Sequence, residues 1–157
     1  MYKIIVLSLA VTIASGTAAL ALDAKVAMDS TAPADASWAA IGDFCGIAKW
    51  HPAIEKCVIS EKDGVTFRTL TLKGGGTILE KQLTFDKAKM SYSYTIEESP
   101  LPVANYKSTL RVTPKDKGST IEWSGAFDAK GAPDADAVKV ITGIYEAGVG
   151  ALAGKAK

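Results

Sequence analysis

The sequence predicts an α+β fold in which a curved antiparallel sheet of about six to seven strands wraps around a long C-terminal helix, with short helices after the first strand. Two observations indicate this. Segments of alternating apolar and polar residues follow one another between residues 56 and 128, separated by glycine, proline and aspartate turn signals. Residues 133–157 instead place apolar side chains at spacings of three and four, which is typical of an amphipathic helix. A twisted strand meander curls, and the helix must bury its apolar face in that curl.

Residues 1–21 have the pattern of a secretory signal peptide. A basic residue precedes an apolar segment at residues 4–15, and Ala19-Leu20-Ala21 fits the cleavage site. The alternative is a retained membrane anchor, but Ser15-Gly16-Thr17 interrupts the apolar run before the roughly 20 residues that a spanning helix needs. We therefore expect a single mature domain, residues 22–157, in the periplasm or secreted, with no stable membrane insertion after cleavage.

The mature chain is predicted to open with a strand at residues 23–31 and to continue into one or two short helices. Pro33 suits a first helical turn, and Trp38, Ile41 and Phe44 follow at helical spacing. The remaining strands are expected at residues 56–61, 65–72, 77–86, 89–97, 105–113 and 120–128.

Residues that favour turns lie between these predicted strands. Asp63-Gly64 is a strong hairpin signal, and the glycines of Lys73–Gly76 mark the next turn. Pro100 and Pro102 cannot serve a central strand, so residues 98–106 are expected to contain a stiff loop. This loop either gates a pocket, docks a protein partner or simply connects two strands.

The C-terminal helix is predicted to begin near Pro133. Its expected buried face comprises Ala137, Ile141, Ile144, Gly148 and Leu152. Gly143, Gly148 and Gly150 are unusual there, because each glycine costs about 1 kcal/mol against alanine in a helix interior. They indicate either a close approach to the sheet or a ligand, or a helix that frays near its end.

The charge balance excludes some partners. Removing Lys3 with the leader lowers the 18 basic residues to 17, which equals the 17 acidic residues, so the mature chain is neutral. No basic stripe is present, which argues against a nucleic-acid partner.

Several segments resemble the START, polyketide cyclase and pollen-allergen (SRPBCC) superfamily. They are DASWAAIGDFCGIAKWHPAIEKC at residues 35–57, RTLTLKGGGTILEKQL at residues 68–83, ESPLPVANYKSTLRV at residues 98–112 and STIEWSGAFDAKG at residues 119–131. The last two look like a subgroup of small exported members. The resemblance implies a helix-grip fold over the whole mature chain. It implies no single function, since members bind lipids, sterols, polyketides and hormones, and some catalyse cyclisation. A related exported group is linked to methanol oxidation, as an accessory to the dehydrogenase.

Cys45, His51 and Cys57 invite three interpretations. Their spacing lacks the C-x-x-C or H-x₃-H of zinc sites, and three soft ligands fall short of the usual four, so we expect no metal. In an oxidising compartment we favour a Cys45–Cys57 disulfide. His51 is then a structural corner before Pro52, although a lone general base or a ligand contact stays open.

Two charged residues lie within predicted strands. If the Gly74–Gly76 turn has three residues, Arg68 faces Gln82 with Glu80 as a diagonal neighbour, and all three share a face with apolar side chains. A two-residue turn instead brings Arg68 opposite Lys81. An inward Arg68–Glu80 pair would orient a polar ligand group or act in acid–base work.

These patterns define a candidate site. Aromatic and polar residues on the inward strand faces are typical of an apolar pocket with a few hydrogen-bonding groups. The expected ligand-contacting residues are Trp50, His51, Arg68, Leu70, Glu80, Gln82, Tyr92, Tyr94, Tyr106, Trp123 and Ile144. The favoured function is binding of a small apolar or amphipathic ligand without a cofactor. One alternative is a cyclase or dehydratase that uses His51, Arg68 and Glu80, and another is an accessory protein that docks a periplasmic dehydrogenase.

Overall fold

The computed structural model describes residues 21–155. The predicted leader lies outside these residues except for its last position, so it stays a prediction. The elements are β1 (Leu22–Ser30), α1 (Ala34–Ile41), α2 (Ile47–Trp50), β2 (Ile54–Lys62), β3 (Val65–Leu72), β4 (Thr77–Asp86), β5 (Ser91–Glu98), β6 (Val103–Pro114), β7 (Ser119–Ala129) and α3 (Asp134–Lys155).

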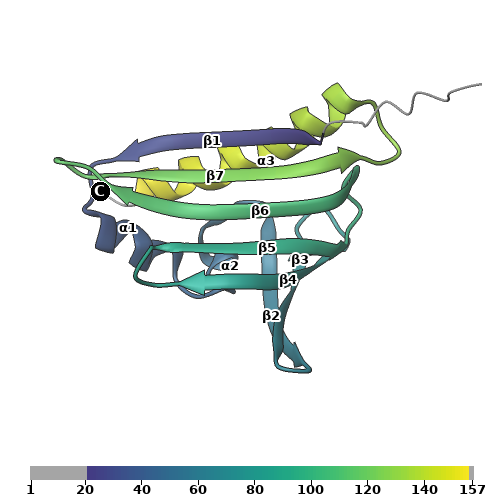
Figure 1. Ribbon diagram of the computed structural model, residues 1–157, viewed down its shortest axis with the longest axis horizontal. Coiled ribbons are helices and arrows are strands. Elements are labelled where there is room, and N and C mark those ends of the chain that lie inside the picture. Colours follow the sequence, from purple (N-terminus) through teal and green to yellow (C-terminus); the bar gives the residue numbers. More distant parts are fainter. Residues whose placement is uncertain (1–20, 156–157) are drawn as a thin grey trace, which may run out of the picture.

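The strands form one antiparallel sheet in the order β1-β7-β6-β5-β4-β3-β2. Figure 1 shows α3 lying along β1 and β7, while β2 runs at a steep angle to β4–β7 because the sheet curls. The helices α1 and α2 cross over between the first strand and the second. This is the predicted α+β helix-grip fold, which is therefore confirmed.

Several helices and strands begin or end at residues other than those predicted. Helix α1 ends at Ile41 because Gly42 adopts a φ of 76°, so Phe44 lies beyond the helix rather than on it. Strand β5 begins at Ser91, since Met90 adopts a φ of 48° in the preceding turn. Strand β2 begins earlier than expected, at Ile54.

The buried stripe of α3 includes four of the five predicted residues, and Ile144 is the exception. Its fully buried side chains are Ala137, Ile141, Tyr145, Val149 and Leu152. Ile144 is only half-buried. By length and composition, residues 134–154 of α3 could cross a membrane. In this domain α3 packs its apolar stripe against β1 and β7 as the core helix.

Close approach explains one of the three helix glycines. A Cβ at Gly148 would lie 2.6 Å from Trp123 and 2.8 Å from His51, so only glycine lets α3 come this near. A Cβ at Gly143 would meet nothing within 4 Å. Gly148 thus fixes how tightly α3 presses on the interior of the sheet.

Candidate ligand-binding site

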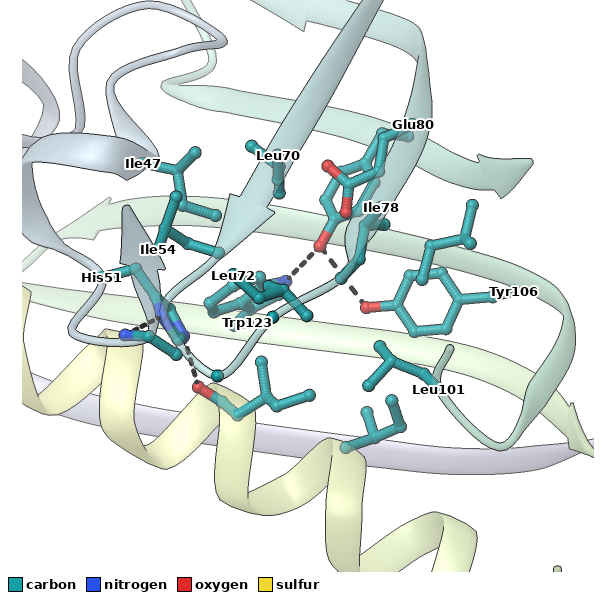
Figure 2. Close-up of a pocket in the computed structure, with 17 residues that line it drawn as sticks. Ile47, His51, Ile54, Leu70, Leu72, Ile78, Glu80, Leu101, Tyr106 and Trp123 are labelled. Carbon is teal, nitrogen blue, oxygen red and sulfur yellow. Dashed lines mark hydrogen bonds between the residues drawn. The ribbon is translucent and has the colours of Figure 1, made fainter. Parts of the chain in front are cut away.

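A cavity of about 280 Å³ lies between the concave face of the sheet, the corner after α2, and α3. Its volume is close to the lower end of the range of small-molecule pockets, roughly 300–1,000 Å³. The lining residues are Ile47, His51, Ala53, Ile54, Leu70, Leu72, Gly74, Gly75, Ile78, Glu80, Ile96, Tyr94, Leu101, Tyr106, Trp123, Ile141 and Ile144. These residues come from α2, strands β2 to β7, α3 and the loops between them, and Figure 2 shows their side chains converging on one space.

The walls of the cavity are mostly apolar. Six isoleucines and three leucines contribute, and the polar atoms come from His51, Glu80, Tyr94, Tyr106 and Trp123. A mostly apolar space with a few placed polar groups favours a small ligand with an apolar body.

Arg68 and Glu80 form a fully buried ion pair behind one wall. Arg68 Nε donates to Glu80 Oε2, and Nη1 donates to the carbonyl oxygen of Phe44. The guanidinium also lies 4.0 Å from the centre of the Phe44 ring and 4.9 Å from that of Tyr94. Within residues 21–155, Nη2 has no hydrogen-bond partner of regular geometry, and the Tyr92 ring lies 5.7 Å from the guanidinium.

Burial acts to lower the pKa of Arg68, but the Glu80 carboxylate and the nearby tyrosines outweigh it, so the pKa is raised. Burial raises the pKa of Glu80, and the Arg68 charge opposes that rise. We take the pair as ionised, because a buried guanidinium without a counter-charge is costly.

The strand register that creates this pair differs from both predicted registers. Arg68 lies directly opposite Glu80, not opposite Gln82 or Lys81. The turn consists of Lys73–Gly75, since Leu72 N–H donates to the Gly76 carbonyl oxygen. The shift of two residues from the three-residue prediction keeps every side chain on its expected face.

His51 is held by backbone groups on both sides of its ring. Its Nε2 lies 3.0 Å from the Ile144 carbonyl oxygen, and the Ala53 N–H donates to Nδ1 at 3.2 Å. Since a carbonyl only accepts, the ring is the neutral tautomer with hydrogen on Nε2. Burial lowers the pKa of His51, although the bond to Ile144 acts in the opposite direction.

A chain of hydroxyl groups runs beneath the cavity. Trp123 Nε1 donates to Ser108 Oγ at 2.9 Å and to Tyr94 Oη at 3.1 Å. The Tyr145 hydroxyl lies 2.5 Å from that of Tyr106 and 3.0 Å from Ser108 Oγ. Tyr145 is fully buried and stacks on Trp123 at 4.7 Å between ring centroids. Burial raises the pKa of Tyr145 to about 12.

Seven of the predicted ligand-contacting residues line the cavity. They are His51, Leu70, Glu80, Tyr94, Tyr106, Trp123 and Ile144. Their contact with a ligand stays a prediction.

Four predicted residues lie elsewhere. Trp50 packs edge-on against Trp123 and donates to the Ile41 carbonyl oxygen. Arg68 is covered by Glu80 and the rings around it. Tyr92 packs against Phe85 and Phe44 beyond the cavity, and Gln82 adjoins an irregularity in β4 outside it.

The sequence analysis missed Tyr145 and Ser108. Tyr145 lies four residues after Ile141, which was a signal for its place on the buried stripe. Ser108 lies two residues after Tyr106 in β6, so strand alternation puts both on one face, which was a signal for its place beside the site.

The Cys45–Cys57 disulfide is present, which confirms that prediction. With both thiols bonded to each other, the Cys–His–Cys metal site is not available. Among residues 21–155, no group of three or more His, Cys, Asp or Glu side chains could hold a metal ion.

The loop around Pro100 does not carry the apolar patch expected of a docking surface. Leu101 turns inward to line the cavity, and Val103 is buried. In the described chain, the large exposed apolar side chains are Val58, Ile59, Leu83 and Val140, none of them in this loop.

Comparison with known proteins agrees with this architecture. The family model described as polyketide cyclase/dehydrase and lipid transport matches residues 21–157. The structure of XoxI from Bacillus cereus is similar, with 31% sequence identity, a TM-score of 0.80, and coverage of 85% of this chain and 94% of that one. An uncharacterized protein from Bacillus thuringiensis has 30% identity and a TM-score of 0.78, over 85% of this chain and 98% of its own.

The aromatase/cyclase Zhui from Streptomyces sp. R1128 shares the fold at 21% identity, with a TM-score of 0.69 over 87% of this chain and 94% of its own. No curated protein matches the chain. The family model covers all of the described domain, and the fold and the cavity agree with it. The chain therefore belongs to the polyketide cyclase/dehydrase and lipid transport family of the SRPBCC superfamily.

Proposed function

We propose that this chain is an exported protein that binds a small apolar or amphipathic molecule in the cavity beneath α3. The observation that carries the proposal is the cavity itself, which is about 280 Å³ in volume and apolar except for a few placed polar groups. A packed core would fill such a space, because each methyl-sized void costs about 1 kcal/mol. Binding requires no metal or cofactor.

Binding is favoured over catalysis by the state of the candidate acid–base groups. Both His51 nitrogens are already engaged with backbone groups, so His51 cannot take up a proton at Nδ1 without losing the bond from Ala53. Arg68 and Glu80 neutralise each other, and Arg68 does not reach the cavity. The aromatase/cyclase Zhui supports only the fold at its level of identity.

Export is supported by two observations of different kinds. The Cys45–Cys57 disulfide is compatible with an oxidising compartment. Residues 1–21 have the composition of a leader. Docking to a periplasmic dehydrogenase has no such support from the Pro100 loop, whose apolar side chains turn inward.

Native mass spectrometry of the full-length gene product, purified from the periplasm of its own cells, tests the proposal. We expect a mass that begins at Leu22, a deficit of two hydrogens from the disulfide, and a bound small molecule that is released on activation. An empty protein that also takes up no apolar compound on titration would refute the binding function. A retained leader would refute export alone.

A further inference from the structure

The hydroxyl chain beneath the cavity has a fixed direction. Ser108 Oγ donates to the Ser124 carbonyl oxygen at 2.8 Å, so the contact between Ser108 and Tyr145 uses the Tyr145 proton. Tyr145 has then given away its proton, so the 2.5 Å contact with Tyr106 uses the Tyr106 proton. Each hydroxyl therefore donates toward Ser124 and away from the cavity.

With this direction of donation, the Tyr94 hydroxyl proton at the cavity end of the chain has no well-placed acceptor. The Tyr94 hydroxyl accepts from Trp123 Nε1. Among the described residues, the acceptor found for its own proton is the Tyr106 hydroxyl, at an oxygen–oxygen distance of 3.4 Å. Hydrogen bonds between hydroxyls normally span about 2.5–3.0 Å. Tyr94 is fully buried and lines the cavity, so it offers a poorly used donor to whatever occupies the space.

An acceptor lies on the same wall. Figure 2 shows the Glu80 carboxylate directed inward from β4, toward the space that Trp123 and Tyr106 border. Oε2 is taken by Arg68. Glu80 pairs with Ile96 across β4 and β5, so Tyr94, two residues before Ile96, is its diagonal neighbour on the same face of the sheet. The wall thus presents a donor and an acceptor together.

The cavity offers no free positive charge to an anionic head. No lysine or arginine of the described residues lines it, and His51 is neutral. Arg68 is already paired with Glu80. An anionic head would meet the Glu80 carboxylate in a low-dielectric space, and an ammonium head would leave the Tyr94 proton without an acceptor.

We infer that the ligand carries a neutral head with both an acceptor and a donor, such as a carboxamide or an alcohol, between Tyr94 and Glu80. The acceptor takes the Tyr94 proton and the donor binds the carboxylate, while the apolar body fills the isoleucine-lined part. This inference rests on the proposed function and adds the head-group class to it.

Calorimetric titration of the purified mature chain at pH 7.5 with matched probes tests the inference. The probes are octanamide, octanoate, octylamine and toluene, which has no polar head. We expect octanamide to bind at least about tenfold more tightly than octanoate or octylamine, the equivalent of one satisfied hydrogen bond. Tyr94→Phe should remove about that factor from octanamide and leave toluene unchanged.

Tyr92→Phe is the matched control, since Tyr92 is an equally buried tyrosine of β5 that does not line the cavity, and it should bind octanamide as the parent does. Octanoate or octylamine that binds as tightly as octanamide would overturn the head-group inference, as would an unchanged octanamide affinity in Tyr94→Phe. In either case binding itself stands. If none of the four probes binds, the proposed function fails, and the inference fails with it.

Discussion

Gly148 and Gly143 offer a matched pair of substitutions that tests how α3 seals the site. Both lie in the same helix and both become alanine, so both gain about 1 kcal/mol of helix propensity. At position 143 the new methyl group meets nothing within 4 Å. At position 148 it would lie 2.6 Å from Trp123, 2.8 Å from His51 and 3.0 Å from Trp50, all of them rigid ring atoms.

Overpacking of this kind typically costs about 1–3 kcal/mol. We therefore expect Gly143→Ala to stabilise the fold by about 1 kcal/mol and Gly148→Ala to fall about 1–3 kcal/mol below it in the free energy of unfolding. Urea unfolding of both variants, followed by tryptophan fluorescence, measures this difference. Equal stabilities would refute the reasoning, because the propensity gain is common to both variants and only the ring contacts differ.

Three further predictions concern the interior around the site. Replacing Cys45 and Cys57 by alanine should lower the free energy of unfolding by about 3 kcal/mol, because the bond closes a loop with a sequence separation of 12; equal stability of parent and variant under non-reducing conditions would contradict this. The fold lowers the pKa of His51 and so favours the neutral imidazole. The neutral imidazole therefore contributes its full stabilisation of the fold above pH 6.5, the ordinary pKa. This contribution is lost as the pH falls from that value through the lowered pKa. The parent should thus lose more stability than His51→Gln between pH 7.5 and 5, at no more than about 1.4 kcal/mol per pH unit, and a parallel pH dependence would refute the assignment. Glu80→Leu should cost about 3–5 kcal/mol by leaving the Arg68 charge unpaired, whereas the double variant Arg68→Met/Glu80→Leu should cost much less, and additive losses in the unfolding cycle would show that the two charges are not coupled.

Periodicity allowed the faces of the strands to be predicted from the sequence. Tyr106, Ser108, Leu110 and Val112 are all buried, as the alternation of β6 predicted, because a strand has no other way to place residues two apart. The same alternation placed Arg68 and Glu80 on a face shared with apolar side chains, but it left open whether the pair points inward.

The β3–β4 strand register, and whether the Arg68 side chain reaches the cavity, could not be predicted from periodicity. Three consecutive glycines permit several placements of the β3–β4 turn, so the pairing of Arg68 depended on backbone contacts such as that of Leu72 with Gly76. Arg68 shares the face of Glu80, but its guanidinium turns to the carbonyl oxygen and ring of Phe44, a contact that periodicity does not reveal.

The stripe of α3 was ambiguous for a related reason. An apolar helix stripe more than about 100° wide includes residues at both i+3 and i+4. Ile144 and Tyr145 could therefore each share the buried face of α3 with Ile141. The curvature of the sheet decides between them by burying Tyr145 against Trp123 and Gly125, where a Cβ would lie 2.3 Å from the tyrosine hydroxyl oxygen. The hydroxyl chain depends on that long-range contact and has no local signature.

Methyl NMR of isoleucine-labelled protein tests the central claim most directly, because isoleucines both line the cavity and lie away from it. Titration with octanamide or toluene should shift the methyl resonances of Ile78, Ile96 and Ile141, which line the cavity. The resonances of Ile41, Ile59 and Ile121, which do not, should stay in place. Unchanged spectra at saturating concentrations of both compounds, or shifts confined to the second group, would contradict a ligand-binding cavity beneath α3.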